Sequence, residues 1–122
     1  MHEMSESATY AAVLIRRLRE GKIYEDFVKA WYPDKGFGFA EGWGPMTGRN
    51  LADAQEIITF ALFKLAEGES LDEAMERIGE QEAARHDRID EVIESTSVRG
   101  LYEVLDEFDF STDETVAAGR PD

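Results

Sequence analysis

The segment from Ile57 to Leu65 constrains the fold most, because it is apolar on both faces that a strand would present. It is dense in β-branched and aromatic residues and is followed by Gly68, a composition typical of a strand. Side chains alternate across a strand, which divides its apolar residues between two faces. The two sets are Ile58, Phe60 and Leu62 on one face, and Ile57, Ala61, Phe63 and Leu65 on the other. Each face needs a cover, and helices can cover only one of them.

Two segments precede this strand with clear patterns. Residues Tyr10-Ala-Ala-Val-Leu-Ile-Arg-Arg-Leu are rich in β-branched and apolar types and are closed by Gly21, which predicts a first strand. Apolar residues then recur at spacings of three and four from Ile23 to Trp31, which predicts a helix. Pro33 stops that helix, because proline disfavours helical backbone in the residue before it.

Two further elements follow the apolar strand. Ser70 and Glu73 form a capping-box pattern at the start of a second helix that we expect to continue towards residue 94, with Gly79 as its candidate break. A final strand is expected at about Gly100 to Phe110. The segment 36–50 holds several glycines between aromatic residues and is predicted as an irregular strand flanked by loops.

The order strand, helix, strand, strand, helix, strand predicts an α+β fold of the ferredoxin-like βαββαβ type. This fold has a four-stranded antiparallel sheet with both helices on one face. We expect a flexible N-terminus over residues 1–8, a single domain over 9–110 and a flexible acidic tail over 111–122. The second face of the sheet needs a partner, and a homodimer supplies one most simply.

The composition argues against several classes of function. The chain has 122 residues and a net charge of −14, so the phosphates of nucleic acids and anionic membranes should repel it. It has no cysteine, which excludes disulfides and thiolate chemistry. No apolar run approaches the roughly 18 residues of a membrane span, and we expect a cytoplasmic protein. Histidine is scarce, with only His2 besides His86, so we expect no bound metal and no cofactor.

The stretch Val13-Leu-Ile-Arg-Arg-Leu-Arg-Glu-Gly-Lys, followed by Tyr24-Glu-Asp-Phe-Val-Lys-Ala-Trp, resembles the opening strand and helix of the dimeric α/β-barrel proteins, especially the antibiotic-biosynthesis-monooxygenase-like domains. The resemblance implies a dimer whose two sheets form a barrel and a pocket between sheet and helices. It also implies that oxygenase or haem-degrading members place an Asn, a Trp and a His or Tyr around that pocket. Here the strand from Ile57 to Leu65 has no Trp and the first strand no Asn, while His86 falls near a haem-degrading position.

Two groups of residues are candidates for a site. Glu82 and His86 are four residues apart on the second helix, where they can share a proton, so they are the candidate catalytic pair. The competing interpretation is a solvated surface pair beyond a break at Gly79. The candidate ligand-binding residues are Phe37, Phe39, Trp43, Asn50 and Tyr102, with Arg49 as a further polar group. The competing interpretation for the aromatics is closure of the core or of a dimer seam.

Two functions therefore remain open. The first is a dimeric α/β-barrel protein that binds a small hydrophobic or aromatic ligand in a pocket between sheet and helices. The second is a cofactor-independent monooxygenase-like enzyme acting on an aromatic or polyketide-like substrate. The resemblance and the Glu82–His86 pair favour the second, and the missing oxygenase residues favour the first.

Overall fold

The computed structural model describes residues 8–39 and 41–121, so the predicted N-terminal segment lies almost wholly outside the described residues. The elements follow the order strand, helix, strand, strand, helix, strand and end in a short 3-10 turn. Their bounds are β1 Tyr10–Leu18, α1 Tyr24–Trp31, β2 Glu41–Asn50, β3 Asp53–Lys64, α2 Leu71–Asp90, β4 Ile93–Glu103 and η2 Ala117–Gly119. This is the predicted ferredoxin-like order.

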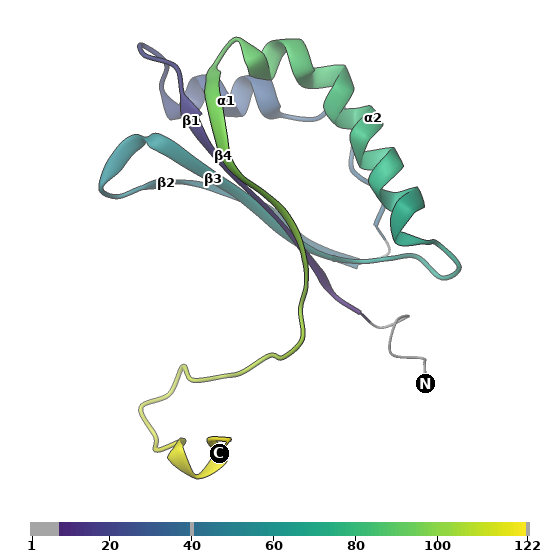
Figure 1. Ribbon diagram of the computed structural model, residues 1–122, viewed down its shortest axis with the longest axis vertical. Helices are drawn as coiled ribbons and strands as arrows, with labels where there is room; N and C mark the ends of the chain where they lie inside the picture. Colours follow the sequence, from purple (N-terminus) through teal and green to yellow (C-terminus); the bar gives the residue numbers. More distant parts are fainter. Residues whose placement is uncertain (1–7, 40, 122) are drawn as a thin grey trace.

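The four strands form one antiparallel sheet in the order β2-β3-β1-β4. Both helices lie on one side of it (Figure 1). The register pairs Ala12 of β1 with Ala61 of β3 and Ile15 with Ile58. Paired residues of an antiparallel ladder point to the same face, so Ala12 and Ala61 belong to the face that the helices cover. Ile15 and Ile58 belong to the other.

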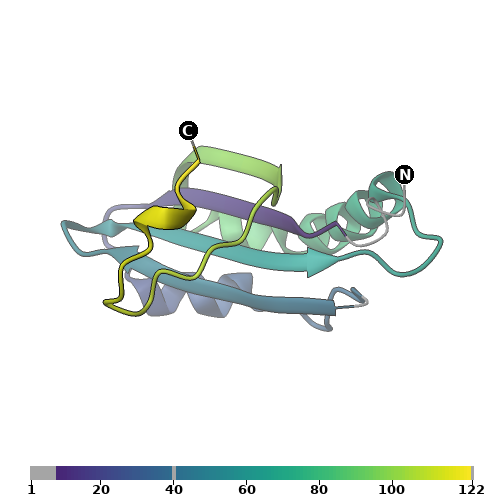
Figure 2. The ribbon, with the colours of Figure 1, turned by 90° about the horizontal axis from the view of Figure 1, so that it is seen from below.

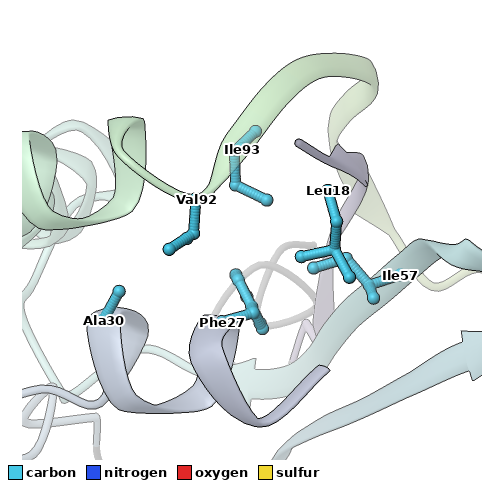
Figure 3. Close-up of a cluster of buried hydrophobic side chains, with 6 residues drawn as sticks. All are labelled: Leu18, Phe27, Ala30, Ile57, Val92 and Ile93. Atoms are coloured by element: carbon cyan, nitrogen blue, oxygen red, sulfur yellow. The ribbon is translucent and has the colours of Figure 1, made fainter. Parts of the chain in front are cut away.

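The core lies where α1 and the end of α2 meet the ends of β1 and β3. Its buried members are Leu18, Phe27, Ala30, Ile57, Val92 and Ile93 (Figure 3). The side chains of Leu18 and Ile57 are 1% exposed and Phe27 is fully buried. Because α1 has only eight residues, it covers one end of the sheet and leaves the other end to α2 and the loop before β2.

Both helices begin with a capped end, and the cap of α2 is the one that Ser70 and Glu73 predict. The Glu73 backbone N–H donates to Ser70 Oγ at 3.1 Å, and the Ser70 N–H donates back to Glu73 Oε1 at 2.9 Å. In α1, the Ile23 N–H donates to Asp26 Oδ2 at 2.9 Å. These bonds satisfy amides that have no partner within the helix.

Several element bounds differ from the sequence expectation. The glycine-rich segment forms a ten-residue strand, β2, which pairs with β3 through an irregularity between Trp43 and Met46. There Gly44 has a φ of +93°, and a Cβ on it would lie 2.8 Å from Met46 N, which explains a glycine at this position. Helix α2 runs unbroken through Gly79 and ends at Asp90.

Strand β4 begins earlier and ends earlier than expected, at Ile93–Glu103 rather than near 100–110. Its bounds are set by its partner strand β1. The pairing begins where Ile93 lies opposite Leu18 and ends where Glu103 lies opposite Tyr10. The Val104 N–H still donates to Thr9 O at 2.8 Å, and the chain then leaves the sheet on the side away from the helices (Figures 1 and 2). Among the described residues, no helix is long and apolar enough to cross a membrane.

Candidate functional site

A pocket of about 100 Å³ lies between the sheet and the helices. Its floor is the covered face of β1 and β3, where Ala12 and Ala61 stand opposite each other. Their methyl groups leave space that larger side chains would occupy. Its walls come from α1, from α2 and from the loop between α1 and β2. The main wall residues are Trp31, Phe37, Phe39 and Ile78, and Phe63 of β3 extends the floor.

Two phenylalanines of the loop close the pocket over this floor. The Phe39 ring stacks on Phe63 of β3, with centroids 4.2 Å apart and planes 18° apart. The Phe37 ring lies 6.3 Å from Phe39. Such contacts hold aromatic rings in a defined arrangement, so the loop presents a largely apolar wall to the pocket.

Helix α2 holds the loop in place through its polar side chains. Arg77 donates from Nε to Phe37 O at 2.8 Å and from Nη2 to Gly38 O at 3.3 Å, and it forms an ion pair with Glu69. Its guanidinium carbon lies 5.7 Å from the centroid of the Phe39 ring. The hydrogen bond from Arg77 holds the pKa of the Glu69 carboxyl below its ordinary value.

Arg85 supports the pocket from the C-terminal half of α2. Its side chain is 5% exposed, with Nε donating to Gln81 O at 3.1 Å and Nη1 donating to Trp31 O. The guanidinium carbon lies 5.7 Å from the Phe37 ring centroid. Burial lowers the pKa of Arg85, because the charged form loses contact with water. Arg85 thus links the end of α1 to the pocket.

Arg16 contributes the second buried guanidinium. It lies on the helix-covered side of β1, is 4% exposed and borders the pocket. Its Nη1 has no hydrogen-bond partner among the described residues, and its guanidinium carbon lies 5.8 Å from the Phe27 ring centroid. Burial lowers the pKa of Arg16, against the opposing effect of the Glu82 carboxylate.

The predicted catalytic pair lies at the side of this pocket. Glu82 borders the pocket and accepts a hydrogen bond from Arg99 Nη1 at 2.8 Å. His86 is exposed and borders an adjoining surface groove, which it shares with Arg16, Glu82 and Arg99. The two residues therefore meet at the groove rather than inside the pocket. Their catalytic role stays a prediction.

The predicted ligand-binding residues occupy three places. Phe37 and Phe39 line the pocket. Trp43 is paired with Leu62 and is 43% exposed on the opposite face of the sheet. Tyr102 is paired with Ala11 on that same opposite face.

Asn50 lies outside the pocket, at the turn between β2 and β3. It donates to Glu56 Oε1 at 2.8 Å and accepts from Ala52 N at 2.7 Å. Arg49, just before it in β2, is exposed. Contact of Asn50, Arg49, Trp43 and Tyr102 with a ligand stays a prediction.

Three polar residues of the pocket were missed by the sequence reasoning: Arg16, Arg85 and Thr59. A signal for Arg16 was present, because it shares strand parity with Ala12, Leu14 and Leu18. An arginine on the apolar side of a strand is either buried with the core or leaves a gap in it, so its position is notable. Among the residues that the structure describes, no group of three or more metal-ligating side chains comes together.

Comparisons with known proteins bear on the fold. No protein-family model and no curated protein matches the chain. Among solved structures, the fold is similar to that of a protein from Chloroflexus aurantiacus J-10-fl that is provisionally named an antibiotic biosynthesis monooxygenase. The TM-score is 0.60 at 7% sequence identity, over 84% of this chain and 99% of that chain. At this identity the likeness shows the ferredoxin-like fold alone.

Proposed function

We propose that the chain binds a small hydrophobic or aromatic molecule in the pocket between sheet and helices, as a homodimer joined through the uncovered face of its sheet. The observation that carries the proposal is the aromatic loop, whose Phe37 and Phe39 are held by α2 over the paired Ala12 and Ala61. An apolar pocket with a few convergent polar groups is the usual form of a small-molecule site. Arg16 and Arg85 are such groups.

Binding is tested by calorimetric titration with 2-naphthamide, a neutral, flat aromatic probe. Wild-type protein should bind it at one saturable site. The Ala61→Leu variant should bind it weakly or not at all, because the larger side chain fills the floor. Ala54→Leu is the matched control, since Ala54 lies on the same strand, is exposed and does not border the pocket. Equal binding by all three proteins would place the probe elsewhere and overturn the proposed site.

The uncovered face of the sheet supports the homodimer. Apolar residues from all four strands point to it: Val13, Ile15, Met46, Ile58, Phe60, Leu62 and Val98. Trp43 and Met46 are both 43% exposed. A contiguous apolar patch of this kind marks an interaction surface, and a second copy presents a matching apolar patch under twofold symmetry.

The segment 104–110 adds apolar surface on the same side. Its exposed side chains are Val104, Leu105, Phe108 and Phe110, and the two phenylalanine rings stack on each other with centroids 5.6 Å apart. The segment leaves the sheet opposite the helices and, seen from below, crosses in front of the strands (Figure 2). We therefore include it in the proposed dimer surface.

Sedimentation equilibrium tests the dimer. The wild-type protein should sediment at about twice the chain mass of 13.8 kDa at micromolar concentration. Leu62→Asp places a charge on the uncovered face, opposite the exposed Trp43, and should shift the mass to that of one chain. Ala83→Asp, on the exposed side of α2, should leave the dimer intact. A wild-type mass of one chain would contradict the proposed interface.

A second candidate function is cofactor-independent oxidation of an aromatic or polyketide-like substrate. The fold likeness to the Chloroflexus protein favours it, as does the position of Glu82 and His86 beside the pocket. Oxygen uptake with quinol-type aromatics, and turnover of haem, would be measured for wild type, His86→Ala and the neighbouring control Asp87→Ala. Turnover that only His86→Ala loses would support the enzyme, and absence of turnover in wild type would overturn it.

A further inference from the structure

Arg16 is buried with hydrogen-bonding capacity that the protein leaves unused. The other residues on its side of β1, Ala12, Leu14 and Leu18, are apolar. Its side chain is 4% exposed, and Nη1 has no hydrogen-bond partner among the described residues. Burying a charged donor without an acceptor costs free energy, so an unsatisfied group of this kind calls for an acceptor.

The charges around Arg16 do not supply that acceptor. Glu82 is the nearest opposite charge, and its Oε1 already accepts from Arg99 Nη1 at 2.8 Å. Arg99 and Arg85 act on Arg16 with the same sign as its own charge. One carboxylate thus faces three guanidinium groups, in a chain whose net charge is −14. The charge around Arg16 is therefore positive on balance, although the net charge of the whole protein is strongly negative.

Arg85 differs from Arg16, because two of its donor atoms are bonded to the protein. Its Nε and Nη1 donate to the backbone carbonyls of Gln81 and Trp31. Arg85 therefore contributes charge and a fixed wall, while Arg16 keeps a free donor. The pocket that Arg16 borders is otherwise walled largely by apolar residues such as Phe37, Phe39 and Ile78.

We propose that the ligand is a small aromatic or apolar acid whose oxyanion accepts a hydrogen bond from Arg16 while its apolar part lies against Phe37 and Phe39. The proposal rests on the proposed function and names the chemical class of ligand for that site. A carboxylate and a deprotonated phenol both carry such an oxyanion. Hydrogen bonds from a guanidinium to an oxyanion are stronger than those between neutral groups.

The test compares 2-naphthoate with 2-naphthamide, which have the same shape and differ in charge. Calorimetry on the full chain should give wild type an affinity for the acid about tenfold higher than for the amide, the size expected of one charge-assisted bond. Arg16→Met keeps an apolar stem without the charge, and it should remove this preference, because the acid loses a charge-assisted hydrogen bond whereas the amide loses only a weaker one. Circular dichroism confirms that the variant is folded.

Two further variants sharpen the result. Glu82→Gln removes the negative charge beside Arg16, which would repel an oxyanion bound there, and it should strengthen binding of 2-naphthoate but not of 2-naphthamide. Arg17→Met is the matched control, because Arg17 points to the other face of β1 and bonds Asp53 at 2.8 Å; it should change neither affinity. Replacing 2-naphthoate by 2-naphthol above its pKa distinguishes a phenolate ligand from a carboxylate ligand.

The possible failures are distinguishable. Equal binding of acid and amide by wild type, with loss of both in Ala61→Leu, would overturn the anionic class and leave the proposed pocket standing. Absence of binding of either probe would overturn the proposed function together with this inference. A preference for the acid that survives in Arg16→Met would overturn the assignment to Arg16.

Discussion

Phe39 stacks on Phe63 with ring centroids 4.2 Å apart, and this contact joins the loop between α1 and β2 to the sheet. Without it, the loop would be attached mainly through the polar side chains of α2, Arg77 and Gln81. The stack therefore keeps the loop against the end of the sheet that α1 does not reach. With the loop in place this end is a walled pocket, and without it the end would be an open surface.

The first prediction concerns this stack. Phe39→Ala should lower the free energy of unfolding by about 1–3 kcal/mol, because it removes a partly buried aromatic contact, and should weaken binding of 2-naphthamide. Urea denaturation and calorimetry measure the two effects. Tyr32→Ala is the control, since Tyr32 is 67% exposed and should change neither quantity. Unchanged binding in Phe39→Ala would argue that the ring is no part of the site.

The second prediction concerns the attachment of the loop to α2. Arg77→Lys keeps the charge that pairs with Glu69 but loses the fork that reaches Phe37 O and Gly38 O, since lysine presents a single ammonium. Amide hydrogen exchange should become faster over residues 36–39 and stay unchanged in β1. Identical exchange in the loop of variant and wild type would show that the carbonyl contacts do not hold it.

The third prediction is a pH dependence at Glu69. Its pKa is lowered in the folded protein by Arg77, so its ionised form favours folding at pH values above the unfolded pKa of about 4.3. That contribution is lost as the pH falls through the lower folded value. The stability difference between wild type and Glu69→Gln should therefore be present at pH 7 and shrink below about pH 4. A difference independent of pH would contradict it.

The fourth prediction concerns the segment 104–110. Replacing Leu105 and Phe108 together by aspartate should raise the dissociation constant of the dimer, because both side chains are exposed in one chain and are proposed to be covered by the partner. Sedimentation across a dilution series measures the shift. The matched control replaces Glu107 and Asp109 by serine, which removes charge and leaves the apolar side chains. An unchanged dissociation constant in the aspartate variant would exclude the segment from the interface.

Much of the fold was predictable because its signals are local. The apolar strand at Ile57, the capping box at Ser70 and the stop at Pro33 each act within a few residues, and they give the element order that the structure confirms. The bounds of β4 were not predictable in this way. They are set by pairing with β1, a contact between residues far apart in the sequence.

The site was predictable only in part, for the same reason. Phe37 and Phe39 were identified as aromatic residues of a glycine-rich segment, and they line the pocket. Trp43 belongs to the same glycine-rich segment, but pairing with Leu62 turns it to the opposite face. Arg16 stands beside Arg17, and strand alternation assigns it to the side of Leu14 and Leu18; this signal was present in the sequence but was not used.

The central claim is that the ligand lies in the pocket between sheet and helices, and the two tryptophans of the chain test it directly. Trp31 borders the pocket and Trp43 lies on the opposite face of the sheet. Their indole N–H signals would be followed by NMR during titration with 2-naphthamide, with each signal assigned from a Trp→Phe variant. We expect the Trp31 signal to shift saturably while the Trp43 signal stays fixed. A saturable shift of Trp43 alone would contradict the account.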